Sequence, residues 1–119
     1  MHPEWGCAME LAVRREGAVT VVQPAGARLD AMVAVQFKDR MKAAVEGGSD
    51  RVVLDLSPVG FLDSSGLGAV VAVRRFLRDG QSLELAELTP AVQRVFRLTR
   101  MDTVFVLHER VGDALHPAV

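Results

Sequence analysis

The chain has 119 residues, the size of one domain, and carries 14 Lys and Arg against 15 Asp and Glu, so its net charge is −1. Hydrophobic residues make up 50% of the chain and charged residues 24%, a balance that excludes an intrinsically disordered protein. The near-zero net charge argues against direct binding to nucleic acid, which normally requires a basic face.

The same features predict a soluble, cytoplasmic protein. Cys7 is the only cysteine, so an intrachain disulfide is impossible and a reducing compartment is favoured. No unbroken apolar run is longer than that at 69–73, which is far shorter than the roughly 20 residues of a membrane-spanning helix, so membrane insertion is not expected. Residues 1–8 show no basic stretch followed by an apolar one, and we expect a loose leader there, followed by one domain over 9–119.

The first half of the chain predicts a hairpin followed by a helix. Residues 10–23 contain an alternating segment and a β-branched segment, separated by turn residues, which is typical of two antiparallel strands. A helix is predicted from Asp30 to about Val45, because apolar residues recur at helical spacing there. The Asp30 carboxylate is expected to cap this helix by accepting a hydrogen bond from a free amide of its first turn.

The second half alternates between strands and helices. The expected elements are a strand over 51–56, a helix over 64–78, a strand over 82–87, a helix capped by Thr89 with Pro90 at its first position, a strand over 103–107 and a weak helix over 109–115. Such alternation implies right-handed crossovers. The predicted fold class is therefore a single α/β domain, with a mixed, mostly parallel sheet of about five strands, an N-terminal hairpin and about four helices.

The junction between the strand over 51–56 and the next helix is unusual. Residues 61–68 read FLDSSGLG, so a carboxylate and two hydroxyls begin a helix that has two glycines in its first turns. Each glycine costs a helix up to about 1 kcal/mol relative to alanine. Either close backbone packing or access for another molecule is expected to compensate for this cost.

Three interpretations of the junction fit the residues. Asp63 or Ser64 can simply be the N-cap of the helix. Nucleophilic catalysis by Ser64 or Ser65 is disfavoured, because neither has the flanking glycines of a hydrolase elbow and no histidine lies near in sequence. A phosphorylated serine fits, because free amides at a helix N-terminus accept a phosphate, whose charge of about −1.5 to −2 would repel a docked partner.

Three motifs in order carry a resemblance to a known family. They are G-x-x-L-D at Gly26–Asp30, D-L-S-x-V-x-F-x-D-S-S-G-L-G at Asp55–Gly68 and T-P-x-V-x-x-x-F at Thr89–Phe96. With them, the chain resembles the STAS-domain family, and within it the stand-alone anti-sigma factor antagonists of bacteria. The resemblance covers residues 26–107, and it implies the STAS fold for the domain expected over 9–119.

The resemblance also implies a function by partner switching. In that family, the unphosphorylated antagonist binds an anti-sigma factor, which is a serine kinase, and thereby frees a sigma factor and regulates transcription. The kinase phosphorylates the second serine of the D-S-S-G element, which is Ser65 here, and a metal-dependent serine phosphatase reverses the step. The protein itself is then a switch with no catalytic residue and no cofactor. The partner-binding face implied by the resemblance comprises Asp30, Asp63, Ser64, Ser65, Gly66, Leu67 and Gly68.

Other possibilities stay open at the level of sequence. STAS domains also serve as adaptor or scaffold subunits of transporters and of stress-sensing complexes, which is the alternative function. No cluster of Cys, His and Asp has the spacing of a metal site. The oligomeric state is left between a monomer and a weak dimer. Family members commonly carry glycine where this chain has Arg100, and a left-handed backbone at that arginine would cost roughly 1–2 kcal/mol.

Overall fold

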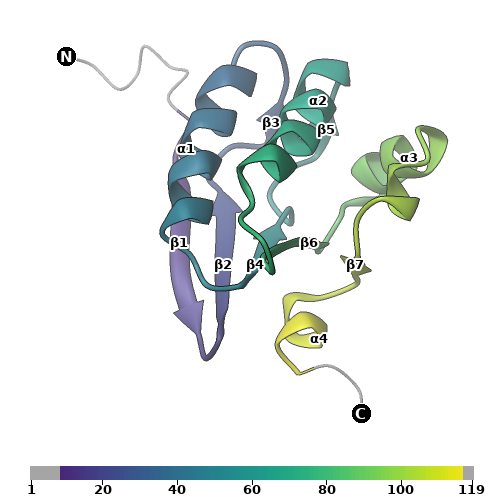
Figure 1. The fold of residues 1–119 in the computed structure, drawn as a ribbon. Coiled ribbons are helices and arrows are strands. Elements are labelled where there is room, and N and C mark those ends of the chain that lie inside the picture. Colours follow the sequence, from purple (N-terminus) through teal and green to yellow (C-terminus); the bar gives the residue numbers. More distant parts are fainter. Residues whose placement is uncertain (1–8, 117–119) are drawn as a thin grey trace.

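The structure is a computed structural model, and it describes residues 9–116 (Figure 1). The leader predicted over 1–8 lies outside the described residues. The elements in chain order are β1 (Leu11–Glu16), β2 (Val19–Pro24), β3 (Arg28–Leu29), α1 (Ala34–Glu46), β4 (Arg51–Asp55), β5 (Phe61–Leu62), α2 (Ser64–Val73), a 3₁₀ turn (Arg74–Phe76), β6 (Ser82–Ala86), α3 (Pro90–Leu98), a second 3₁₀ turn (Met101–Thr103), β7 (Leu107–His108) and α4 (Val111–Leu115).

The main sheet has five strands in the order β1-β2-β4-β6-β7. The hairpin strands β1 and β2 pair antiparallel, and each of the other neighbouring pairs is parallel. The predicted fold class is confirmed: the chain forms one α/β domain with an N-terminal hairpin and four α-helices in its described part. None of these helices has the length and apolar character needed to cross a lipid bilayer.

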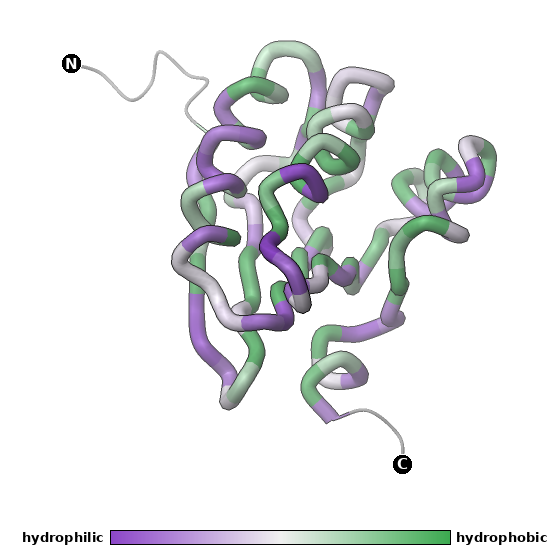
Figure 2. Tube along the Cα trace, viewed as in Figure 1, coloured by the Kyte–Doolittle hydropathy of each residue, from purple (hydrophilic) through white to green (hydrophobic). Residues whose placement is uncertain are grey.

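Helices lie on both faces of the main sheet. Helices α1 and α2 lie side by side over one face (Figure 1), and the larger core between them and the sheet contains Phe37, Met41, Leu54 and Leu85, all fully buried. The short α4 packs over the opposite face, where Val111 contacts a smaller apolar cluster. The hairpin end of β1 is hydrophilic, in contrast to the central strands (Figure 2), which agrees with its position at the sheet edge.

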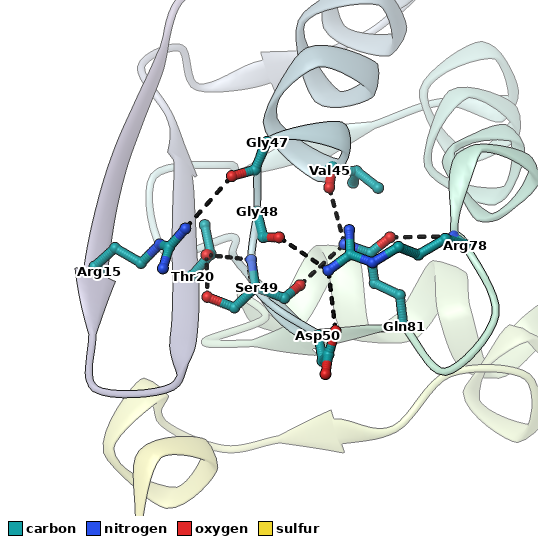
Figure 3. Close-up of polar contacts among 9 residues, drawn as sticks. All are labelled: Arg15, Thr20, Val45, Gly47, Gly48, Ser49, Asp50, Arg78 and Gln81. Atoms are coloured by element: carbon teal, nitrogen blue, oxygen red, sulfur yellow. Dashed lines mark hydrogen bonds and ion pairs between the residues drawn. The ribbon is translucent and has the colours of Figure 1, made fainter.

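Polar contacts fasten the loop between α1 and β4 at one end of the sheet (Figure 3). The Gln81 side chain donates to the carbonyls of Val45 and Ser49 at 2.8 and 2.9 Å. The Arg78 guanidinium donates to the Gly48 carbonyl at 3.1 Å and pairs with Asp50 at 3.0 Å. These side chains therefore serve the fold rather than a ligand.

The start of α1 differs from the prediction. The helix begins at Ala34 rather than at Asp30, with Val33 as an N-cap that makes no side-chain hydrogen bond. The Asp30 carboxylate accepts a hydrogen bond from the Met32 amide at 3.0 Å, and its carbonyl accepts from the amides of Val33 and Ala34. Asp30 thus caps a separate turn before α1, because its side chain satisfies the turn before the helical hydrogen bonds begin.

The C-terminal third contains two further differences. The strand expected over 103–107 is wrong in position, since β7 covers only Leu107–His108. Arg100 has φ 63°, and the amides of Thr103 and Val104 bond back into a 3₁₀ turn that displaces the strand. Thr89 does precede α3, but its hydroxyl donates to the Val59 carbonyl at 2.8 Å instead of capping the helix.

The second helix is also shorter than predicted. It ends as an α-helix at Val73 and continues only as the 3₁₀ turn Arg74–Phe76, whereas the prediction extended it to Arg78. The chain leaves this turn through Leu77 in an extended conformation, with ψ 135°. Arg78 is thereby free to make the loop contacts described above.

Candidate functional site

A two-stranded parallel pairing brings two of the sequence motifs together. In it, Arg28 of β3 lies opposite Phe61 of β5, and Leu29 opposite Leu62. The Asp63 amide continues the pairing by donating to the Leu29 carbonyl at 3.2 Å. Asp30 and Asp63 therefore leave adjacent strands at the same end, immediately before the turn that leads to α1 and before α2.

The N-cap of α2 is Asp63, not Ser64. Asp63 has an extended backbone, and its Oδ1 accepts a hydrogen bond from the Gly66 amide at 2.9 Å. Ser64 and Ser65 are the first two helical residues, so their own amides lie in the first turn, where no intrahelical partner exists. Ser64 therefore has no capping role, and of the two alternatives for the N-cap the structure has Asp63.

The two glycines of this helix have different surroundings. Gly66 is buried, and a Cβ on it would lie 2.0 Å from the Leu29 carbonyl oxygen. Gly68 is exposed, and a Cβ on it would meet nothing within 4 Å. Close backbone packing therefore requires Gly66, whereas Gly68 leaves an open surface. Leu67 between them is half-buried and packs against the main core.

The two serine side chains face the solvent. Both Ser64 and Ser65 are exposed, and within residues 9–116 neither hydroxyl takes part in a protein hydrogen bond. Among residues 9–116, no histidine is placed as a base for these hydroxyls, because His108 is engaged with Glu84 in a different part of the sheet and His116 follows α4. The Ser65 hydroxyl is thus open to an enzyme that brings its own catalytic groups.

Ser65 lines a shallow groove between α1 and α2. The groove has a volume of about 160 Å³ and is lined by Ala34, Val35, Lys38, Ser65, Gly68, Ala69 and Ala72. Val35, one of the lining residues, leaves 65% of its surface exposed, and Met32, three residues earlier in the chain, leaves 70%, which is unusual for large apolar side chains. The groove therefore combines an apolar border with one hydroxyl and one ammonium group.

The charged groups around the site are partly paired. Asp30 forms an ion pair with Arg28 at 3.1 Å, and the Arg28 guanidinium lies 4.1 Å from the centroid of the Phe61 ring. In the described chain, no group of three or more His, Cys, Asp and Glu residues is placed to hold a metal ion. The site therefore presents two exposed hydroxyls next to carboxylates that are engaged within the protein.

A second polar cluster, which the sequence reasoning missed, lies in the main sheet. Glu84 of β6 accepts hydrogen bonds from the Arg51 guanidinium at 2.6 and 2.9 Å, and it contacts His108 at 2.7 Å. The hydrogen bonds from Arg51 hold the pKa of Glu84 at about 2, against the opposing effect of burial. The alternating pattern of the strand over 82–86 places Glu84 opposite the core-facing leucines, which is the signal that could have found it.

The comparisons with known proteins agree with this geometry. The family model described as "Mlab, STAS domain" matches residues 11–109. The chain belongs to the STAS-domain family. The predicted resemblance is thus confirmed at the level of the family, and the STAS domain covers β1 to β7 in full.

Individual STAS proteins are similar over most of the chain. The structure of an anti-sigma factor antagonist from Mycobacterium paratuberculosis shares 29% identity with a TM-score of 0.81, covering 90% of this chain and 91% of the other. A STAS-domain protein from Planctomyces limnophilus shares 26% identity with a TM-score of 0.78, over 88% and 93%. The phosphorylated form of the Bacillus protein SpoIIAA shares the fold, with a TM-score of 0.64 at 18% identity over 89% and 96%.

A curated relative supplies a closer match over a shorter stretch. BtrV of Bordetella bronchiseptica, whose name calls it an anti-sigma factor antagonist, is 38% identical over 73 residues. The match covers 60% of this chain and 63% of BtrV, so it spans less than two thirds of that relative.

Proposed function

We propose that this STAS protein is an anti-sigma factor antagonist that is switched by phosphorylation of Ser65. The unphosphorylated form binds an anti-sigma factor serine kinase in the cytoplasm and thereby frees a sigma factor. The kinase phosphorylates Ser65 and then dissociates from the antagonist. A metal-dependent serine phosphatase removes the phosphate and restores binding. The protein contributes no catalytic group of its own.

The observation that carries this proposal is the state of the Ser65 side chain. It is exposed, it makes no hydrogen bond within the described residues, and it borders a groove flanked by exposed apolar side chains. The neighbouring carboxylates of Asp30 and Asp63 are engaged within the protein. The Ser65 hydroxyl therefore makes no hydrogen bond that stabilises the fold, and it lies where a partner can contact it.

The physical chemistry of a phosphate at this position explains how binding would be lost. The first-turn amides of α2 and the positive end of its dipole can accept the new charge, so the fold survives. A partner docked on the exposed Val35 side of the groove would instead have to desolvate a group of about −1.5 to −2 charge. The modification thus changes the surface while the host domain stays folded.

The comparisons support the proposed function but do not identify the phosphorylated residue. BtrV and the Mycobacterium paratuberculosis protein carry the name of anti-sigma factor antagonists. SpoIIAA, which shares the fold, is known in a phosphorylated form. The D-S-S-G element of this chain begins α2, so the same kind of modification has a plausible acceptor here.

The first experiment is labelling by the cognate anti-sigma factor serine kinase, with ATP and mass spectrometry. The native protein and Ser64→Ala are expected to gain one phosphate on residue 65, whereas Ser65→Ala gains none. Ser64→Ala is the matched control because it removes an equally exposed hydroxyl one residue away. Full labelling of Ser65→Ala, or a phosphate found on Ser64, would overturn the assignment.

The second experiment measures binding to the same kinase by calorimetry. Ser65→Asp is expected to weaken binding at least tenfold. Ser65→Asn, whose side chain has the size of aspartate but no charge, should weaken binding much less. Equal affinities for the two variants would contradict a charge-based switch. Recovery of a transporter ATPase instead of a kinase in a pull-down would favour the adaptor function.

A further inference from the structure

We propose that Lys38 of α1 is the counter-ion of the phosphate on Ser65, so that phosphorylation joins α1 to α2 across the groove. This inference rests on the proposed phosphorylation of Ser65 and adds the residue that receives the phosphate. It also explains how the modification closes the docking groove.

The position of Lys38 follows from the way the two helices pack. They lie side by side (Figure 1), and the groove takes Ala34, Val35 and Lys38 from α1. Helical side chains lean toward the N-terminus of their own helix. The stem of Lys38 therefore leans toward the turn of Ala34, which lines the same groove as Ser65.

The floor of the groove leaves this path open. Between the two helices it is formed by Gly68, Ala69 and Ala72, none of which has a side chain longer than a methyl group. One turn further along α1, the Lys42 ammonium lies 5.5 Å from the centroid of the Phe76 ring. Lys42 is thus engaged with Phe76, and Lys38 is the lysine among the residues that line the groove with Ser65.

The carboxylates around Ser65 favour a cation beside a phosphate at this position, in addition to the first-turn amides of α2. Asp63, two residues before Ser65, is negative, and its carboxylate already accepts from the Gly66 amide. Asp30 adds a second carboxylate nearby, but Arg28 pairs with it. Because these carboxylates lie close to the start of α2, a phosphate dianion here is stabilised less than at a helix N-terminus without neighbouring negative charges. Lys38 forms no ion pair within the part of the chain that the structure describes, so its charge is available.

The ion pair would change the docking surface as well as its charge. A phosphate held against Lys38 lies over the small residues of the groove floor, so a partner side chain can no longer enter. The carboxylate of an aspartate is smaller and reaches less far, so Ser65→Asp is expected to inhibit partner binding less completely than phosphoserine does.

The test uses the full-length chain with phosphoserine incorporated at position 65 during translation, so that no kinase is needed. The pKa of the phosphate is read from a ³¹P NMR titration, and a phosphoserine ordinarily titrates near pH 6. In the native background we expect the phosphate to titrate about 0.3–0.7 pH unit lower than in Lys38→Gln, because the ammonium stabilises the dianion. Lys42→Gln, the matched control one turn away, should titrate as the native protein does.

Two further variants keep the test decisive. Lys38→Arg retains the positive charge and should keep the low pKa, which also covers the case in which Lys38→Gln does not fold. An unchanged titration in a folded Lys38→Gln, or loss of the low pKa in Lys38→Arg, overturns the proposal. A rise in Arg28→Gln alone would assign the phosphate to Arg28 and overturn it equally. None of these results affects the kinase assay, whose failure would overturn the proposed function itself.

Discussion

The polar side chains of the main sheet and those at the start of α2 differ in whether the protein itself binds them. In the main sheet, Glu84 is buried, and its carboxylate is satisfied by Arg51 and His108. At the start of α2, Ser64 and Ser65 are exposed, and within residues 9–116 their hydroxyls bind nothing. The polar groups of the sheet form hydrogen bonds that stabilise the fold. The polar groups at the start of α2 are exposed and can contact another molecule.

The backbone shows the same contrast within a single helix. Gly66 is required for the approach of α2 to the Leu29 carbonyl, whereas Gly68, two residues later, borders open space. One glycine therefore positions the site, and the other contributes to the surface that the site presents.

The largest effect is expected for Gly66→Ala. Its Cβ would lie 2.0 Å from the Leu29 carbonyl oxygen, so β3 and α2 must separate, at a cost of about 3 kcal/mol in the free energy of unfolding. Chemical denaturation measures this cost. Gly68→Ala is the control, and it should stabilise the protein by up to about 1 kcal/mol, because alanine favours the helix and meets no neighbour. Equal stabilities of the two variants would refute the packing role of Gly66.

The second effect concerns the polar cluster in the sheet. The pKa of Glu84 is about 2 in the folded protein, against an ordinary value of 4.5. The unfolded state therefore binds more protons between these values, so Glu84 stabilises the fold above about pH 5, and this contribution is lost as the pH falls toward 2. Partial screening by solvent at Arg51 limits the contribution to about 1–3 kcal/mol.

Denaturation of the native protein and of Glu84→Gln between pH 3 and 7 checks this prediction. The variant should be less stable at neutral pH and should lose part of the acid dependence. Glu109→Gln is the matched control, since Glu109 is exposed and should change stability by less than about 0.5 kcal/mol. An acid dependence that is unaltered in Glu84→Gln would show that other carboxylates cause it.

The third effect tests a backbone feature outside both regions. Arg100 adopts φ 63°, a conformation that costs a residue with a Cβ roughly 1–2 kcal/mol. Arg100→Gly should therefore raise the free energy of unfolding by about 1 kcal/mol, after allowing for the greater flexibility of glycine in the unfolded chain. Arg97→Gly, in the last turn of α3, should lower it by a similar amount. Opposite signs are the expected result, and equal signs would contradict it.

The smallest effect on stability is expected at the proposed modification site. Ser65→Ala should change the free energy of unfolding by less than about 0.5 kcal/mol, because the hydroxyl makes no bond that the fold needs. Thr20→Val provides the contrast: the Thr20 hydroxyl is buried, accepts from the Ser49 amide at 2.9 Å and should cost about 1–2 kcal/mol when removed. A destabilising Ser65→Ala would assign Ser65 to the fold.

The sequence alone predicted the elements that are long enough for their apolar residues to recur at the spacing of a strand or a helix. The hairpin, α1, β4, β6 and α3 were predicted because alternation or helical spacing over several residues marks which face is buried. The D-S-S-G element was predicted as the start of a helix for the same local reason. Asp63 of this element was expected as a possible N-cap, because its short side chain can reach an amide of the first turn. It is the N-cap of α2 in the structure.

Only the tertiary structure decided how these pieces meet. The strands β3 and β5 have two residues each, too few for any pattern, and their pairing depends on packing between segments far apart in the chain. The same holds for β7, whose position is set by its pairing with β6 and by the left-handed turn at Arg100. The groove that places Lys38 beside Ser65 likewise exists only because α1 and α2 pack together. Local sequence determines which face of an element is apolar, but the partner that covers that face is chosen by the free energy of the whole fold.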